Sequence, residues 1–146
     1  MKRAFHFGFV VALAMAGCGG EETKDDTNKT LLELKISTGV VRTITVTEGG
    51  NIAEVISPSK ATGKLKPAEL QELKGLASKV EWAKVPADGY KTADGNPVAG
   101  GRSYDLTYNG ITPPKTVHSM DGATAEDENL KKLRDTMEND ANKIGK

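Results

Sequence analysis

The chain has 146 residues, and its 20 basic and 20 acidic side chains leave no formal net charge at pH 7. This balance argues against nucleic acid as a partner, because nucleic-acid-binding domains carry a clustered basic excess. The length is sufficient for one domain with a modest hydrophobic core.

The first 17 residues have the layout of an export signal. Lys2 and Arg3 precede an apolar stretch, residues 5–16, that is too short to span a bilayer. The only cysteine follows small residues in Met15-Ala16-Gly17-Cys18, which resembles the lipobox of bacterial lipoproteins. The resemblance implies that residues 1–17 are removed and that Cys18 carries a diacylglycerol and a further acyl chain such as palmitate. An ordinary secretory signal with an incidental cysteine is the alternative.

Lipidation would determine how the protein meets the membrane. Loss of Lys2 and Arg3 leaves 18 basic and 20 acidic side chains, a formal charge of −2. We therefore expect attachment through the lipid alone, without help from anionic lipids. Gly19 stands where an Asp would resemble an inner-membrane retention signal, so we expect a position in the cell envelope at the outer membrane.

Residues 18–30 are predicted to be a flexible tether behind the lipidated cysteine. From Gly19 to Thr30 they contain no large apolar side chain, so they cannot bury enough surface to offset the entropy of ordering. Residues 31–146 are predicted to form the single folded domain.

Three strands are predicted first, at residues 32–36, 40–47 and 52–56. In the second, Arg42, Ile44 and Val46 fall on one face, and β-branched residues fill the other. Gly49-Gly50 predicts a tight turn between the second and third strands.

Residues 58–63 are predicted to be a loop, followed by a helix that begins near Pro67 and reaches about Val80. Leu70, Leu73 and Leu76 recur at helical spacing, and proline suits a first helical turn. Trp82 is expected to pack where this helix meets the sheet.

Residues 86–101 are predicted to be a long irregular loop rich in glycine and proline. Strands follow at 103–108 and 115–120, and an amphipathic helix at about 125–144. Thr124 and Asp127 resemble a capping box at the start of that helix.

The predicted order is thus β-β-β-α-β-β-α. Strands joined by short turns indicate an antiparallel sheet, and two one-sided helices can cover one of its faces. The predicted fold class is α+β, with two helices packed on one face of a single sheet.

No complete catalytic or metal-binding constellation is found. His118 is the only histidine after the signal, and we expect it at a surface or half-buried position of a strand. No Gly-x-Ser-x-Gly motif for a catalytic serine is present. The densest acidic group lacks the spacing of a calcium loop, and charges at a helix start explain it more simply: Asp121, Glu126, Asp127 and Glu128. We therefore expect no enzyme, no cofactor and no metal, although a chance pair of carboxylates suited to glycoside hydrolysis stays an open alternative.

The long loop offers a candidate partner-binding surface, because loops on a rigid sheet commonly bind partners. Its candidate residues are Tyr90, Asn96, Pro97 and Arg102. A long solvated connection without a partner is the alternative.

The element order from about residue 31 to 143 resembles that of a group of small bacterial envelope proteins. The matching pieces are a strand and glycine turn, a Lys-Leu-x-Pro-Ala-Glu-Leu helix start, a Tyr-rich strand and a closing amphipathic helix: Thr43–Gly50, Lys64–Leu70, Ser103–Tyr108 and Leu130–Met137. The arrangement is also similar to the emfourin family, proteinaceous inhibitors of thermolysin-like metallopeptidases. The resemblance implies a non-enzymatic domain that inserts loops into a protease cleft. The Gly-Gly-Phe-like element of the opening hairpin is missing at Ser37-Thr38-Gly39-Val40, and we assign no inhibitory residue.

The leading hypothesis is a lipid-anchored envelope lipoprotein with a small non-catalytic protein-binding domain. The narrower alternative is an inhibitor of thermolysin-like metallopeptidases, and a second alternative is a small hydrolase. The expected partner is a protein of the envelope or periplasm, with a peptidase as one option.

Overall fold

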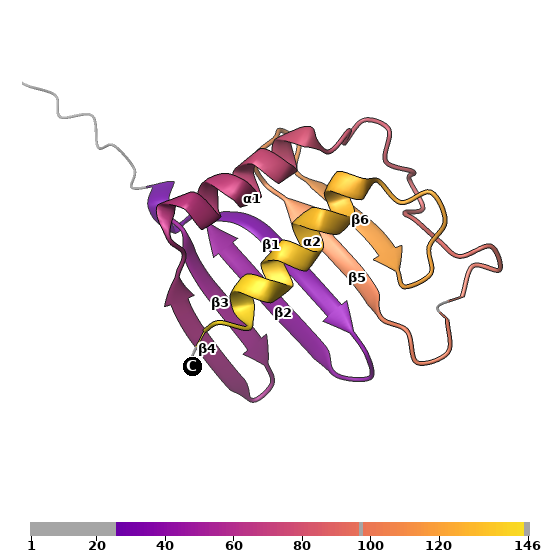
Figure 1. Cartoon of the computed structure of the whole chain (residues 1–146), viewed down its shortest axis with the longest axis horizontal. Helices are drawn as coiled ribbons and strands as arrows, with labels where there is room; N and C mark the ends of the chain where they lie inside the picture. Colours follow the sequence, from indigo (N-terminus) through magenta and orange to yellow (C-terminus); the bar gives the residue numbers. More distant parts are fainter. Residues whose placement is uncertain (1–25, 97, 145–146) are drawn as a thin grey trace, which may run out of the picture.

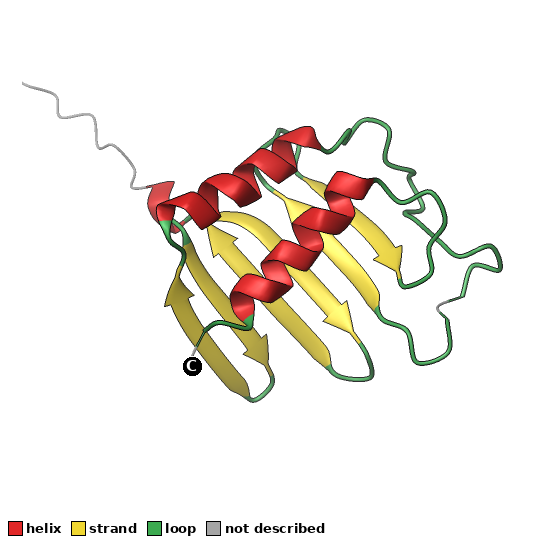
Figure 2. Ribbon diagram, in the orientation of Figure 1, coloured by secondary structure: helices red, strands yellow, loops and turns green. Residues whose placement is uncertain are grey.

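The computed structural model describes residues 26–96 and 98–144, and Figure 1 shows the path of the chain. The elements in order are a 3₁₀ turn η1 (Asp26–Asn28), β1 (Thr30–Ser37), β2 (Val41–Thr47), β3 (Asn51–Ile56), β4 (Ser59–Lys64), α1 (Pro67–Lys79), β5 (Ser103–Tyr108), β6 (Lys115–Met120) and α2 (Glu128–Ala141). The six strands form one antiparallel sheet in the order β4-β3-β2-β1-β5-β6. Both helices lie on the same face of that sheet (Figure 2), so the predicted α+β class is confirmed.

The core lies between the sheet and the two helices. Alternate residues of β1 point toward the helices, and Leu32 and Leu34 are fully buried there. Ile44 and Leu106 flank Leu34 on the neighbouring strands. The helices contribute the buried side chains Leu73, Ala77, Leu130, Leu133, Met137 and Ala141. These are the helix positions expected from the apolar spacing, so the periodicity identified the buried face of each helix.

The prediction of a loop at residues 58–63 is wrong, because residues 59–64 form β4. This strand pairs with β3 in a regular antiparallel register from Ile56↔Ser59 to Asn51↔Lys64. Its sequence, Ser-Lys-Ala-Thr-Gly-Lys, has no large apolar residue. Its strand conformation therefore depends on hydrogen bonding to β3, which a local pattern does not reveal.

The second helix begins three residues later than predicted. Asp127 is its N-cap and accepts hydrogen bonds from the backbone N–H groups of Asn129 (2.8 Å) and Leu130 (3.0 Å). Ala125 has φ of 59°, in the left-handed region that interrupts a helix. The cap predicted at Thr124 is therefore replaced by Asp127.

Trp82 packs as expected between the end of α1 and the sheet. Its indole N–H donates to the carbonyl of Ala77 at 2.8 Å, and its ring stacks on Tyr108 of β5 with centroids 5.1 Å apart. The contact fixes the connection after α1 against the end of β5, next to the β6 edge of the sheet.

The folded part includes residues that the sequence assigned to the tether. The backbone N–H of Glu48 donates to the carbonyl of Lys29 at 2.9 Å, and that of Gly49 donates to Thr27 at 2.8 Å. The chain therefore enters the domain beside the turn between β2 and β3. The predicted signal, Cys18 and the earlier tether residues lie outside the described residues. None of the helices in the described part of the chain is both long and apolar enough to cross a membrane.

Candidate functional site

The two ends of the sheet differ in what they present. At the end where the chain enters, Thr30 of β1 lies opposite Thr47 of β2. At the other end, Ser37 lies between Val41 of β2 and Ser103 of β5. We call this second end, with turns 38–40 and 57–58 and the segment 98–102, the distal end. In Figure 1 the 3₁₀ turn at Asp26 and the hairpin tips lie at opposite ends of the strands.

All of the large apolar side chains that are exposed in the described part of the chain lie at the distal end. They are between 38% and 57% exposed, and they are Val40, Val41, Val55, Ile56 and Val98. Four come from the β1–β2 hairpin and the end of β3, and the fifth, Val98, lies in the segment before β5. A scattered apolar residue would need no explanation, but their collection at one end of the domain marks a candidate interaction surface.

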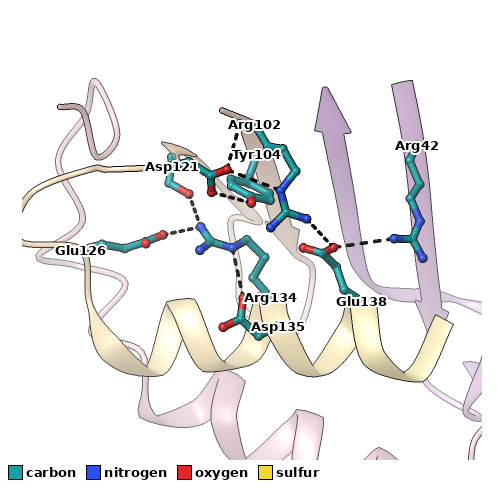
Figure 3. A network of polar contacts seen from close by, with 9 residues as sticks. Arg42, Arg102, Tyr104, Asp121, Glu126, Arg134, Asp135 and Glu138 are labelled. Carbon is teal, nitrogen blue, oxygen red and sulfur yellow. Dashed lines mark hydrogen bonds and ion pairs between the residues drawn. The ribbon is translucent and has the colours of Figure 1, made fainter. Parts of the chain in front are cut away.

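A network of ion pairs supports the distal end from the helix side (Figure 3). Glu138 of α2 accepts a hydrogen bond from Arg102, just before β5, at 2.8 Å, and its carboxylate lies 3.6 Å from Arg42 of β2. Arg42 also pairs with Glu54 of β3 and donates to Asn142 at 2.7 Å. Four separate segments are thereby joined directly behind the exposed apolar residues.

Asp121 closes the same end of the sheet, just after β6. It accepts hydrogen bonds from the Tyr104 hydroxyl (2.7 Å) and the Arg102 backbone N–H (3.0 Å). Burial alone would raise the pKa of Asp121, but these two hydrogen bonds and the Arg102 charge outweigh it and lower the pKa below its usual value. Burial and the bond to Asp121 raise the pKa of Tyr104. Asp121 is thus a charged acceptor at neutral pH and Tyr104 a neutral donor.

Arg134 of α2 is the most deeply buried charge in this network. Its guanidinium donates to Ser119 of β6 (2.9 Å) and to Glu126 (2.8 Å), and it lies 3.9 Å from the centre of the Tyr104 ring. Its Nε makes no hydrogen bond, although Asp135 is 3.7 Å away. These contacts attach the first half of α2 to β5 and β6.

The structure does not gather the residues of the predicted partner-binding loop into one exposed surface. Tyr90 is 9% exposed and belongs to the core cluster. Arg102 belongs to the network behind the distal end, and Asn96 is exposed on a turn where its backbone N–H bonds Asp94 at 3.2 Å. Pro97 lies outside the described residues.

The remaining polar candidates have structural contacts. His118 Nδ1 lies 2.8 Å from the Asp105 carboxylate on the face of the sheet away from the helices, half-exposed as expected. Asp121 accepts a hydrogen bond from Tyr104, and Glu126 accepts one from Arg134. Asp127 accepts from the backbone N–H of Leu130 at the start of α2. In residues 26–96 and 98–144, no group of three potential ligands stands close enough to hold a metal ion.

The apolar residues of the distal end were not selected from the sequence. Val41 alternates with Arg42 and Ile44, so the alternation does place it on the face away from the core. Its exposure, however, depends on that face having no covering layer. Neither a family model, nor a curated protein, nor a solved structure matches this chain.

Proposed function

We propose that this chain is a lipid-anchored bacterial envelope protein whose single domain binds another protein through the distal end. The observation that carries the proposal is the collection of exposed apolar side chains at the end of the sheet opposite to the entry of the chain. The described chain begins at Asp26, at the end of the sheet opposite to the apolar turns, so an anchor that precedes it would leave those turns free for a partner.

The network behind the distal end supports the same proposal. Arg42, Arg102 and Glu138 tie β2, β5 and α2 together, so the hairpin and the start of β5 are held in place before a partner arrives. A binding surface that is already ordered loses less conformational entropy on association. Binding residues on turns of a rigid sheet are also the common arrangement in proteins.

Site-specific photo-crosslinking in intact cells tests the proposed surface. A photoreactive residue replacing Val41 should give one dominant crosslinked protein, because Val41 is 55% exposed at the distal end. The matched control places the same residue at Lys115, an exposed position of β6 at the entry end, opposite Tyr108. Equal crosslinking from both positions, or none from Val41, would contradict the proposal.

The anchor needs its own experiment, because the predicted lipid site lies outside the described residues. Metabolic labelling with an alkyne-bearing fatty acid should label the wild-type protein, and Cys18→Ser should abolish the label and move the protein to the soluble fraction. Retention of the label in Cys18→Ser would refute lipidation at this residue.

A narrower form of the proposal is inhibition of thermolysin-like metallopeptidases, which the resemblance to emfourin implies. The exposed hairpin tips favour it, because such a domain would insert turns into a cleft. Progress curves for a panel of these peptidases should show inhibition by the wild-type domain and weaker inhibition by Val41→Asp. If every peptidase keeps full activity at a large excess of the domain, the inhibitor hypothesis is wrong. The broader proposal of a protein-binding domain would not be affected.

A further inference from the structure

The edge of the sheet at β4 has backbone groups available for another strand. In the described part of the chain β4 pairs only with β3. The Leu65 N–H donates to the Gly50 carbonyl at 2.9 Å in continuation of the same register. Because hydrogen-bonded pairs alternate along antiparallel strands, the N–H and C=O groups of Lys60, Thr62 and Lys64 point away from β3.

The side chains of the same three residues carry a distinct charge pattern. Lys60, Thr62 and Lys64 are exposed, and they lie on the face of the sheet away from the helices. Neither Lys60 nor Lys64 forms an ion pair within residues 26–96 and 98–144. The two lysines are four positions apart along the strand, a distance of about 13 Å between their Cα atoms. The open edge therefore presents two unpaired positive charges at a fixed spacing.

A cavity of 340 Å³ adjoins the other side of β4, between the start of α1 and the end of α2. Its apolar wall consists of Ile52, Leu65 and Ile144, and its polar rim includes Glu69 and Lys143. Gly63 leaves this space open, and a Cβ at that position would come within 3.3 Å of Ile144. A side chain from a strand added beside Gly63 could enter the cavity.

We propose that the β4 edge binds an extended peptide segment of another protein, antiparallel to β4, with the pattern acidic–apolar–x–x–acidic. The two carboxylates lie opposite Lys64 and Lys60, and the apolar residue lies opposite Gly63, where its side chain enters the cavity. Main-chain hydrogen bonds to Lys60, Thr62 and Lys64 supply affinity, and the alternating side chains supply specificity.

Charge complementarity selects this occupant over a second copy of the chain. Antiparallel pairing of two β4 edges about Thr62 would bring Lys60 of one copy opposite Lys64 of the other, and like charges directly opposite are destabilising. Lysine on an edge strand opposes self-association in this way. An acidic segment turns the same two charges into attractions.

Fluorescence anisotropy of a labelled peptide, Thr-Glu-Val-Thr-Val-Glu-Thr, with the full-length protein in detergent tests the proposal. Replacing both glutamates of the peptide by lysine should weaken binding about tenfold or more, as should the double substitution Lys60→Glu and Lys64→Glu. The lysine peptide should in turn bind the double variant better than it binds the wild-type protein. The matched control, Lys131→Glu with Lys132→Glu on the exposed side of α2, should leave binding unchanged.

A second peptide separates strand addition from simple charge attraction. N-methylation of the backbone amides that face β4 removes donors without changing charge, and it should abolish binding. Equal binding of the methylated peptide, or a loss in the Lys131 and Lys132 control as large as in the double variant, would overturn the proposal. These outcomes are independent of the distal end, because Val41→Asp should not change the affinity for this peptide.

Discussion

The two outer strands of the sheet are protected in different ways. β6 is covered: the segment after α1 runs along it, and the Tyr90 N–H donates to the His118 carbonyl at 2.9 Å. Figure 1 shows this segment beyond β6, and among the described residues β4 has no strand neighbour other than β3. β4 instead carries Lys60 and Lys64 on an exposed strand. The β6 edge is thus partly covered by the chain at His118, and the β4 edge carries exposed lysines, so β4 is the more accessible edge in the described part of the chain.

The covered edge depends on a close approach that only glycine permits. A Cβ on Gly89 would lie 2.2 Å from the His118 carbonyl oxygen, and its φ is +75°. The open edge has no comparable requirement. We expect the half of the molecule that ends at β6 to carry more of the stability than the half that ends at β4.

The largest effect is expected for Arg134→Met, which acts on the covered half. The substitution leaves Glu126 partly buried without its partner, and removing one member of a buried ion pair costs about 4 kcal/mol. Urea unfolding should show this loss. The control substitution at the β4 side is Lys60→Met, at an exposed residue that forms no ion pair in the described part of the chain, and it should leave the urea midpoint nearly unchanged. Equal losses would remove the distinction between the two halves.

Gly89→Ala should have the next largest effect and lower the free energy of unfolding by about 3 kcal/mol. Part comes from the left-handed backbone and part from the clash with the His118 carbonyl. Gly95→Ala is the control, because its φ of +76° is similar and no atom lies within 4 Å of its Cβ position. It should lose only about 1 kcal/mol. A Gly89→Ala loss no larger than this would show that the segment can leave β6 freely.

Asp121→Asn should have a smaller effect and lower the free energy of unfolding by about 1 kcal/mol. The lowered pKa of Asp121 means that it stabilises the folded protein above its ordinary pKa near 4 and loses that contribution as the pH falls through the folded-state value. The stability gap between wild type and Asp121→Asn, measured by urea unfolding, should therefore be constant from pH 5 to 7 and should close below about pH 4. A gap that is independent of pH down to 2 would contradict this assignment.

The smallest effect is expected at the open edge. Substituting Lys60 and Lys64 by glutamate should leave the thermal midpoint nearly unchanged, because neither lysine has an ion-pair partner in the described part of the chain. The measurable change should be in association: at low salt an equimolar mixture of the wild-type protein and this variant should associate more than either protein alone by sedimentation, because each glutamate then lies opposite a lysine. A large drop in the midpoint would indicate that the lysines support the fold itself.

The elements that could be predicted from the sequence are those with a strong period of their own. Leu32, Leu34 and Ile36 alternate, and the leucines of α1 recur at helical spacing, so local pattern and tertiary structure agree there. β4 could not be predicted in this way, because Ser59–Lys64 acquires its conformation from β3. The start of α2 was also predicted wrongly, at Thr124 instead of Asp127. The left-handed backbone of Ala125, which separates the two positions, has no signal in the local sequence.

The candidate site could be predicted less well, because its residues are defined by what lies next to them. The sequence predicts Tyr90 to be a loop residue available to a partner, but the loop folds back on β6 and buries its side chain. Arg102 was selected for the same reason, and its partner Glu138 lies on a helix far along the chain. Val41 is exposed because no layer covers its face of the sheet. None of these neighbours can be read from the local sequence.

The entry of the chain at η1 has a mechanical consequence. β1 begins beside this entry and ends at the distal end, and it is bonded along its length to β2 on one side and to β5 on the other. A force between an anchored N-terminus and a partner held at the distal turns acts along β1, perpendicular to both rows of hydrogen bonds. The bonds are then loaded together in shear, instead of being opened one after another as in a hairpin pulled apart from its end. If the proposed anchor holds the N-terminus, the strand that follows it is thus the strand best placed to bear a load.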